Sequence, residues 1–200
     1  MQAERTMSHS INFDPSSSSD EELLKHIARG YAPAFNCLYD RYGQRLYAYA
    51  LRLTENPAQA EDILQESMLI VWRKAGTYRA EGSVLAWMLS IIRNKCMQLF
   101  RQKPAESIEG SDLDFADEDP SPEKVLSQQD ERNRVREALR HLSPEHREVL
   151  ELVFYQGLSQ KEIAQVCKCQ LGTVKSRLNY ARQQLRGILT RDGLDTKDEP

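Results

Sequence analysis

Apolar side chains in the first half of the chain recur at three- and four-residue steps, and this spacing constrains the fold more than any other feature. The longest such series consists of Phe35, Leu38, Tyr42, Leu46, Tyr49 and Leu53. Side chains of a strand alternate between two faces, whereas a helix places positions with this spacing on one side. The series therefore predicts a long amphipathic helix, and similar series predict further helices as far as residue 190.

Capping signals separate these series from one another. The pairs Asn56-Pro57 and Ser143-Pro144 each place a capping side chain before a proline, and Ser159 stands three residues before Glu162. Asparagine and serine accept hydrogen bonds from the first free amides of a helix, and proline is tolerated in its first turn. Ser159 and Glu162 have the spacing of a reciprocal capping pair. We therefore expect an all-α fold of individually capped helices.

Charge is distributed in blocks, although the whole chain has a net charge of only −3. Residues 23–103 contain twelve basic and six acidic side chains, net +6, and residues 132–191 contain twelve basic and five acidic side chains, net +7. Residues 104–131, between them, contain one basic and ten acidic side chains, net −9. Two basic blocks favour a polyanionic partner, and an ordinary solvated surface is the alternative.

Composition divides the chain into five segments. Residues 1–22 and 191–200 are polar and lack helical periodicity, so we expect a disordered N-terminal segment and a flexible tail. Residues 104–124 combine Pro, Ser, Gly and acidic groups with few large apolar side chains, which predicts an acidic flexible linker. The predicted fold class is therefore all-α, with two small helical domains, residues 23–103 and residues 125–190, joined by that linker.

The sequence lacks the patterns of membrane proteins and of the common enzyme classes. No run approaches the roughly 18 apolar residues that span a bilayer, and the N-terminus has no signal-peptide pattern. We therefore expect a cytoplasmic protein without membrane insertion. There is no glycine-rich phosphate loop or metal-ligand cluster, and Cys167 and Cys169 are too close together for the usual zinc pairs. We expect no metal, no cofactor, reduced cysteines and no enzymatic activity.

The last two predicted helices have the organisation of a helix-turn-helix motif. A short capped helix with Ile163 and Val166 is followed by a connector and by a longer basic helix that starts near Gly172. In such motifs the second helix enters the major groove and presents its N-terminal side chains to base edges. We expect base contacts from Thr173, Lys175, Ser176, Asn179 and Tyr180, and phosphate contacts from Lys161, Arg177 and Arg182. A plain helical hairpin with a solvated basic face is the alternative.

The third predicted helix of the first module, which starts at Ser83, and the loop before it combine aromatic, amide and basic side chains. These are Tyr78, Arg79, Arg93, Asn94, Gln98 and Arg101. Such groups suit the unstacked bases of a single strand, because stacking and edge hydrogen bonds supply the affinity. Tyr78 is equally well explained as a packing residue, and Asn94 and Gln98 as solvent-facing ones.

Several short motifs occur in a fixed order along the two modules. The first module contains residues 60–66 (AEDILQE) leading to Trp72, and Trp87 followed by residues 91–94 (IIRN). The second contains residues 142–147 (LSPEHR), residues 159–164 (SQKEIA) and residues 172–177 (GTVKSR). Together they resemble the extracytoplasmic-function group of bacterial sigma-70 factors. The resemblance spans residues 23–190 and covers both modules.

The resemblance implies a dissociable subunit that recruits core RNA polymerase to promoters and opens the minus-ten element, while the polymerase performs all the catalysis. It implies contacts with the clamp helices of the largest polymerase subunit from Asp62, Gln65, Glu66 and Trp72. It assigns residues 77–82 with Arg93, Asn94 and Gln98 to the minus-ten strand, and residues 172–182 to the minus-thirty-five element. The flap region of the polymerase and an anti-sigma factor are further partners that the family implies.

Two stretches depart from the family pattern. Residues 167–170 form a connector without the glycine that such connectors often contain. Residues 98–100 replace side chains that are often more polar, so the sequence preference at the minus-ten element does not carry over to this chain.

A one-component transcriptional regulator is the alternative function. In that case residues 1–103 would sense a ligand or dimerise, and residues 132–190 would bind an operator. Such a protein needs an effector pocket and a self-association stripe, and the first module shows neither pattern. The basic helix of that module would also have no role if only the second module touched DNA. We therefore favour the sigma-factor interpretation.

Overall fold

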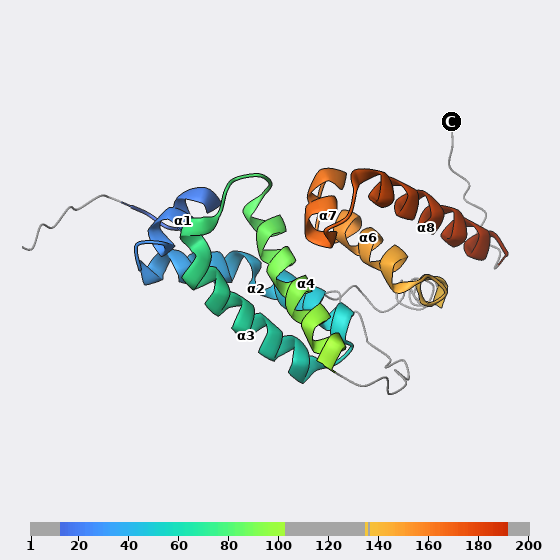
Figure 1. Ribbon diagram of the computed structural model, residues 1–200, viewed down its shortest axis with the longest axis horizontal. Helices are drawn as coiled ribbons and strands as arrows, with labels where there is room; N and C mark the ends of the chain where they lie inside the picture. Colours follow the sequence, from blue (N-terminus) through green and yellow to red (C-terminus); the bar gives the residue numbers. More distant parts are fainter. Residues whose placement is uncertain (1–12, 103–134, 136, 192–200) are drawn as a thin grey trace, which may run out of the picture.

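The computed structural model describes residues 13–102, residue 135 and residues 137–191. Every regular element in these ranges is a helix (Figure 1), which confirms the predicted all-α fold class. The first module consists of α1 (Asp20–Ile27), α2 (Ala32–Thr54), α3 (Pro57–Lys74), the 3-10 turn η1 (Ala75–Thr77) and α4 (Val84–Gln102). The second contains α6 (Pro144–Phe154), α7 (Gln160–Cys167) and α8 (Leu171–Arg191). The predicted linker, residues 104–124, lies outside the described residues.

Helix α2 is the centre of the first module and contacts α1, α3 and α4. Leu38, Leu46 and Tyr49 of its predicted apolar stripe are fully buried, and they pack with Leu89 and Ile92 of α4 in one core. Burying a leucine side chain stabilises a fold by about 1.5–3 kcal/mol, so this stripe supplies much of the stability of the module. None of the helices within the described ranges is both long and apolar enough to cross a bilayer.

The predicted capping residues stand at the helix starts. The Asn56 side chain accepts a hydrogen bond from the Gln59 amide at 3.0 Å and begins α3. Ser143 caps α6, and Ser159 caps α7 in a complete capping box with Glu162. Each such cap contributes about 1 kcal/mol. These short-range signals could be predicted because cap and helix are adjacent in sequence.

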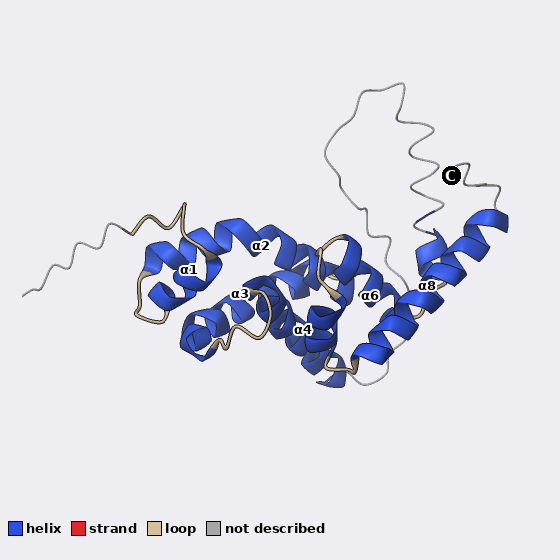
Figure 2. Ribbon diagram, turned by 90° about the horizontal axis from the view of Figure 1, so that it is seen from above, coloured by secondary structure: helices blue, strands red, loops and turns tan. Residues whose placement is uncertain are grey.

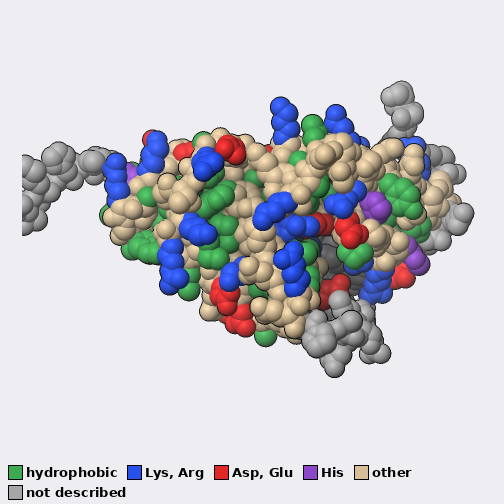
Figure 3. Space-filling model, viewed as in Figure 1, with side chains coloured by type: hydrophobic (Ala, Val, Ile, Leu, Met, Phe, Trp, Pro, Cys, Tyr) green, Lys and Arg blue, Asp and Glu red, His purple; other side chains and the backbone are tan. Residues whose placement is uncertain are grey.

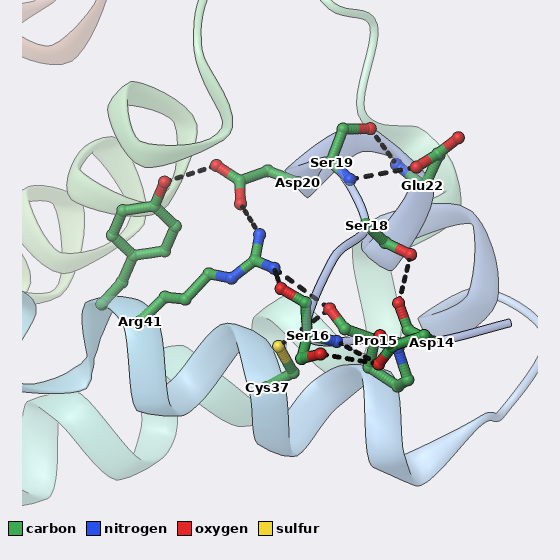
Figure 4. A network of polar contacts seen from close by, with 10 residues as sticks. Asp14, Pro15, Ser16, Ser18, Ser19, Asp20, Glu22, Cys37 and Arg41 are labelled. Carbon is green, nitrogen blue, oxygen red and sulfur yellow. Dashed lines mark hydrogen bonds and ion pairs between the residues drawn. The ribbon is translucent and has the colours of Figure 1, made fainter.

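The segment before α1 packs against α2, although we expected disorder through residue 22 (Figure 4). The Arg41 guanidinium of α2 donates to the backbone oxygens of Pro15 and Ser16, at 3.0 and 2.9 Å, and to Asp20 Oδ1 at 2.9 Å. The Phe13 ring stacks on His26 with ring centroids 3.6 Å apart. Order therefore begins earlier than the predicted residue 23, because one arginine more than twenty residues away supplies the hydrogen bonds. Residues 1–12 lie outside the described residues.

The second module has the predicted helix-turn-helix arrangement, with α8 packed on both α6 and α7. Val174, Leu178 and Ala181 form the buried stripe of α8. In the connector, Lys168 takes the left-handed conformation that glycine usually adopts, with φ of 51°. Left-handed backbone costs a residue with a Cβ about 1–2 kcal/mol. Hydrogen bonds from the Lys168 and Cys169 amides to Gln165 and Ala164 oxygens hold the turn in place.

The two modules contact one another through α4 and α7, which are neighbours in Figure 1. Figure 2 shows α4 at the end of the first module that lies next to α6 and α8. Lys and Arg side chains are spread over both modules on the face that Figure 3 shows, and acidic side chains lie beside basic ones where the modules meet. This contact positions the candidate site of the first module against the second.

Candidate nucleic-acid and polymerase-binding sites

The first half of α8 presents most of the side chains that we expected at duplex DNA. Its buried stripe faces α6 and α7, which leaves the other side of the helix outward. Thr173 and Arg177 are half-buried, and the following side chains are exposed: Lys175, Ser176, Asn179, Tyr180 and Arg182 on α8, and Lys161 on α7. A helix fixed on one side and polar on the other is what major-groove recognition requires.

Tyr180 also has a structural role in this module. Its ring stacks on His146 at the start of α6, with ring centroids 4.6 Å apart and planes 28° from parallel. Its hydroxyl accepts a hydrogen bond from Gln184 Nε2 at 2.9 Å. The side chain remains about half exposed, at 48%. Tyr180 therefore fixes α8 against α6 while one part of the ring stays accessible.

Tyr78 lies in the packing position that we considered for it. Its ring stands against Trp87, with ring centroids 5.6 Å apart, and its hydroxyl donates to the Gly82 backbone oxygen. Partial burial raises the pKa of Tyr78, so the phenol keeps its proton and the hydrogen bond. Tyr78 thus braces the loop of residues 78–82, and the neighbouring Arg79 side chain is exposed.

The predicted strand-binding residues of α4 either face solvent or contact the second module. Gln98 and Arg101 are exposed and Asn94 is half-buried. Because these positions are three and four residues apart, they lie on one side of the helix. Arg93 instead points its guanidinium at Glu148 of α6, with Nε and Nη2 donating to the two carboxylate oxygens at 2.8 and 3.1 Å. Three of the six predicted residues of this site, Arg79, Gln98 and Arg101, are thus exposed. Tyr78, Arg93 and Asn94 are half-buried, and the first two are engaged by Gly82 and Glu148.

The predicted polymerase-binding residues lie on α3. Asp62, Gln65 and Glu66 are exposed, and the Glu66 carboxylate pairs with Lys95 of α4 at 2.7 Å. Trp72 is half-buried and meets the Phe35 ring edge-on, with centroids 5.4 Å apart. Trp72 therefore holds α3 against α2, whereas the three polar side chains face outward.

A groove of about 510 Å³ lies between α2 and α3 beside this acidic face. Residues from both helices line it: Tyr39, Asp40, Gly43, Gln44, Tyr47, Glu61, Leu64 and Gln65. Tyr39 is 44% exposed, and Leu69 of α3 is 55% exposed. Sequence reasoning missed both, because apolar side chains are ordinarily assigned to a core. The exposure of Leu69 could have been predicted from its position seven residues, or two helical turns, after Asp62, which places it on the polar side of α3.

The four cysteines have free thiols. Burial raises the pKa of Cys96 and of Cys167 to about 12, so both thiols stay protonated and unreactive. Among the described residues no group of three or more His, Cys, Asp and Glu side chains is arranged to hold a metal ion.

Comparisons with known proteins agree with this geometry. Residues 38–105 match the family described as Sigma-70 region 2, and residues 138–187 match Sigma-70, region 4. The ECF RNA polymerase sigma factor SigK of Mycobacterium ulcerans (strain Agy99) is 35% identical over 181 residues, covering 88% of this chain and 97% of that protein. SigK of Mycobacterium sp. (strain JLS) is 33% identical over 170 residues, covering 83% and 86%.

Solved structures share the fold. CnrH in complex with the cytosolic domain of CnrY aligns with a TM-score of 0.63 and 24% identity, covering 88% of this chain and 100% of that chain. RpoE from Bartonella quintana, in complex with the anti-sigma factor NepR, aligns with a TM-score of 0.59 and 25% identity, covering 79% and 98%.

A two-module helical protein with a helix-turn-helix in its second module is the class that the fold defines. The chain belongs to the sigma-70 family of RNA polymerase sigma factors, in its extracytoplasmic-function (ECF) group. Members of this family direct transcription initiation and are not a class of enzymes. The match of the first module to region 2 also favours this function over the ligand-sensing alternative.

Proposed function

We propose that this ECF sigma factor binds core RNA polymerase through the exposed face of α3, the minus-ten strand through α4 and its preceding loop, and the minus-thirty-five element through α8. The observation that carries the proposal is the two-sided character of α8. Its buried stripe is fixed on α6 and α7, while its polar, basic side faces outward. Polymerase would supply all the catalysis, and the protein would act in the cytoplasm with it.

The α8 assignment is tested by substitution of a phosphate-contacting residue. Arg177→Ala should weaken binding of the full chain to a short mixed-sequence duplex and reduce the slope of log affinity against log salt by about one. Lys25→Ala removes the same charge from an exposed position on α1 and should leave the slope unchanged. Fluorescence anisotropy over a salt series measures both. Equal slopes for the Arg177 variant and the wild type would reject the role of α8.

The α3 assignment is tested separately. Asp62→Ala combined with Glu66→Ala should weaken association with core polymerase about tenfold, since two interface contacts of about 1 kcal/mol each are lost and part of that loss is screened. DNA binding by the free chain should not change. Glu21→Ala combined with Glu137→Ala removes the same charge from exposed positions elsewhere. Wild-type affinity for polymerase in the Asp62 and Glu66 variant would reject the docking face.

An anti-sigma factor is a further proposed partner. The support is the pair of solved relatives, CnrH and RpoE, of which RpoE is in a complex with an anti-sigma factor by name. Co-expression with a candidate inhibitor followed by gel filtration would test it, and a complex that contains this chain is the expected result.

A further inference from the structure

Two carboxylates of the second module contact the part of the first module that we assign to the minus-ten strand. Glu148 of α6 binds Arg93 in the middle of α4, and Glu162 of α7 binds the backbone before the start of α4. The two contacts join residues 55 and 79 positions apart in the sequence. We name this pair of contacts the carboxylate latch.

Glu148 is the buried half of the latch, with only 6% of its surface exposed. Its carboxylate accepts two hydrogen bonds from the Arg93 guanidinium and a third from the Tyr49 hydroxyl at 2.8 Å. Burial by itself would lower the pKa of Arg93, but the hydrogen bonds and charge of Glu148 raise it instead. A buried charge pair of this kind is stable only while both partners are present, because either one alone would remain unpaired.

Glu162 supplies a helix cap between the modules. Ser83 precedes α4 and accepts a hydrogen bond from the Ala86 amide at 3.2 Å. In a reciprocal capping box, a glutamate at the position of Ala86 would accept the Ser83 amide in return. Alanine cannot do so, and Glu162 accepts that amide at 3.1 Å instead. A side chain of the second module thus helps to cap α4, the helix of the proposed strand-binding site.

Further hydrogen bonds join the two modules beside the carboxylate latch. Gln165 Nε2 donates to the Glu81 backbone oxygen at 2.8 Å, across the same boundary. A Cβ atom added at Gly82 would stand 2.5 Å from Gln165 Oε1, so the absence of a side chain permits this approach. On the α2 side, Arg45 donates to the Gln156 backbone oxygen at 2.9 Å. The contact between Gln165 and Glu81 holds the loop of residues 78–82 against α7.

The carboxylate latch occupies the Arg93 guanidinium and the Ser83 amide, and in other proteins groups of both kinds bind phosphate. An arginine fork binds carboxylate and phosphate with the same paired geometry, and the first amides of a helix form a favourable anion site. We propose that Glu148 and Glu162 take the places of minus-ten strand phosphates, so that packing of the two modules is autoinhibitory. The inference rests on the proposed assignment of α4 and its loop to the minus-ten strand.

The latch makes strand binding depend on separation of the modules. Only the open form presents Arg93 and the start of α4, so the measured affinity for a single strand equals the affinity of the open form multiplied by its population. A change that weakens the latch raises this population. It therefore strengthens single-strand binding without altering any DNA contact.

The test uses the full chain with Glu148→Gln combined with Gln165→Ala. Glutamine keeps the volume of Glu148 but removes its charge, and the Gln165 side chain is exposed, so neither change removes core packing. We expect a larger radius of gyration by small-angle scattering and about tenfold tighter binding of a mixed-sequence single-stranded oligonucleotide. Glu137→Gln, an equal charge change at an exposed position, should alter neither quantity. Gln165→Ala alone should shift both in the same direction by a smaller amount.

Arg93→Ala separates the latch from the DNA contact. This variant also removes one partner of the latch, so it should expand the chain, but it lacks the group that binds the strand and should gain little affinity. An unchanged radius in the combined Glu148 and Gln165 variant would overturn the proposal, as would an expanded chain with unchanged single-strand affinity. Circular dichroism at 222 nm, the standard helix signal, confirms that the variants remain folded.

The strand assignment itself is tested with residues outside the latch. Gln98→Ala combined with Arg101→Ala should lower single-strand affinity in wild type and in the open variant alike, since both side chains are exposed. Loss of affinity here, together with an unchanged radius in the latch variant, would retain the assignment and reject the autoinhibition. No loss in either background would reject the assignment of α4.

Discussion

Glu162 shows how one side chain can serve two helices. Its carboxylate accepts hydrogen bonds from the amide and hydroxyl of Ser159, at 2.9 and 2.7 Å, and from the Ser83 amide at 3.1 Å. Burial acts to raise the pKa of Glu162, but these hydrogen bonds to Ser83 and Ser159 outweigh it and lower the pKa to about 2. The charged form is therefore the one that stabilises the folded state.

This residue predicts a pH dependence of stability. Because the folded-state pKa is below the ordinary value of 4.5, the contribution of Glu162 is complete above pH 4.5 and is lost as the pH falls toward 2. Glu162→Gln should lower the melting temperature at pH 7 by about 3 °C, the effect of roughly 1 kcal/mol from a lost cap, and by much less at pH 3. Thermal melts monitored by circular dichroism measure this. The same decrease at both pH values would contradict the charge-based role, and Glu137→Gln is the control.

At the scale of single elements, signals close in sequence were reliable and long-range ones were not. The caps at Asn56, Ser143 and Ser159 could be predicted because each needs only three or four neighbouring residues. The order of the segment before α1 could not, because its backbone oxygens at Pro15 and Ser16 are held by Arg41 of α2. The sequence marked residues 167–170 as a connector without its usual glycine, but it did not identify Lys168 as the residue with a left-handed backbone, since lysine rarely adopts one.

The Lys168 turn predicts a pair of opposite stability effects. Lys168→Gly should stabilise the second module by up to about 1 kcal/mol, because glycine adopts this conformation without strain. Lys168→Ile should destabilise it by about 1–2 kcal/mol, since a β-branched side chain is poorly tolerated at positive φ. Lys168→Ala controls for the lost charge. Urea titration measures all three, and equal stability of the glycine and isoleucine variants would contradict the turn geometry.

For the whole molecule, the sequence predicted two basic helical modules and their family, but not how they pack. Helical periodicity reports contacts three or four residues apart, whereas Arg93 and Glu148 are joined across 55 positions. We expected Arg93 at DNA for its charge, and that charge explains equally well why a buried carboxylate binds it. The exposed Tyr39 and Leu69 were missed for a related reason, because burial depends on the neighbours that the fold brings near. The site residues themselves stay predictions that the substitutions above test.

Transcription by purified bacterial core RNA polymerase on a pool of genomic fragments, with and without this protein, measures whether the protein directs initiation. A sigma factor produces new start sites that appear only when the protein is added, and we expect these sites to be lost when Asp62→Ala and Glu66→Ala are combined. Polymerase that initiates at the same sites with and without the protein would contradict this role in initiation.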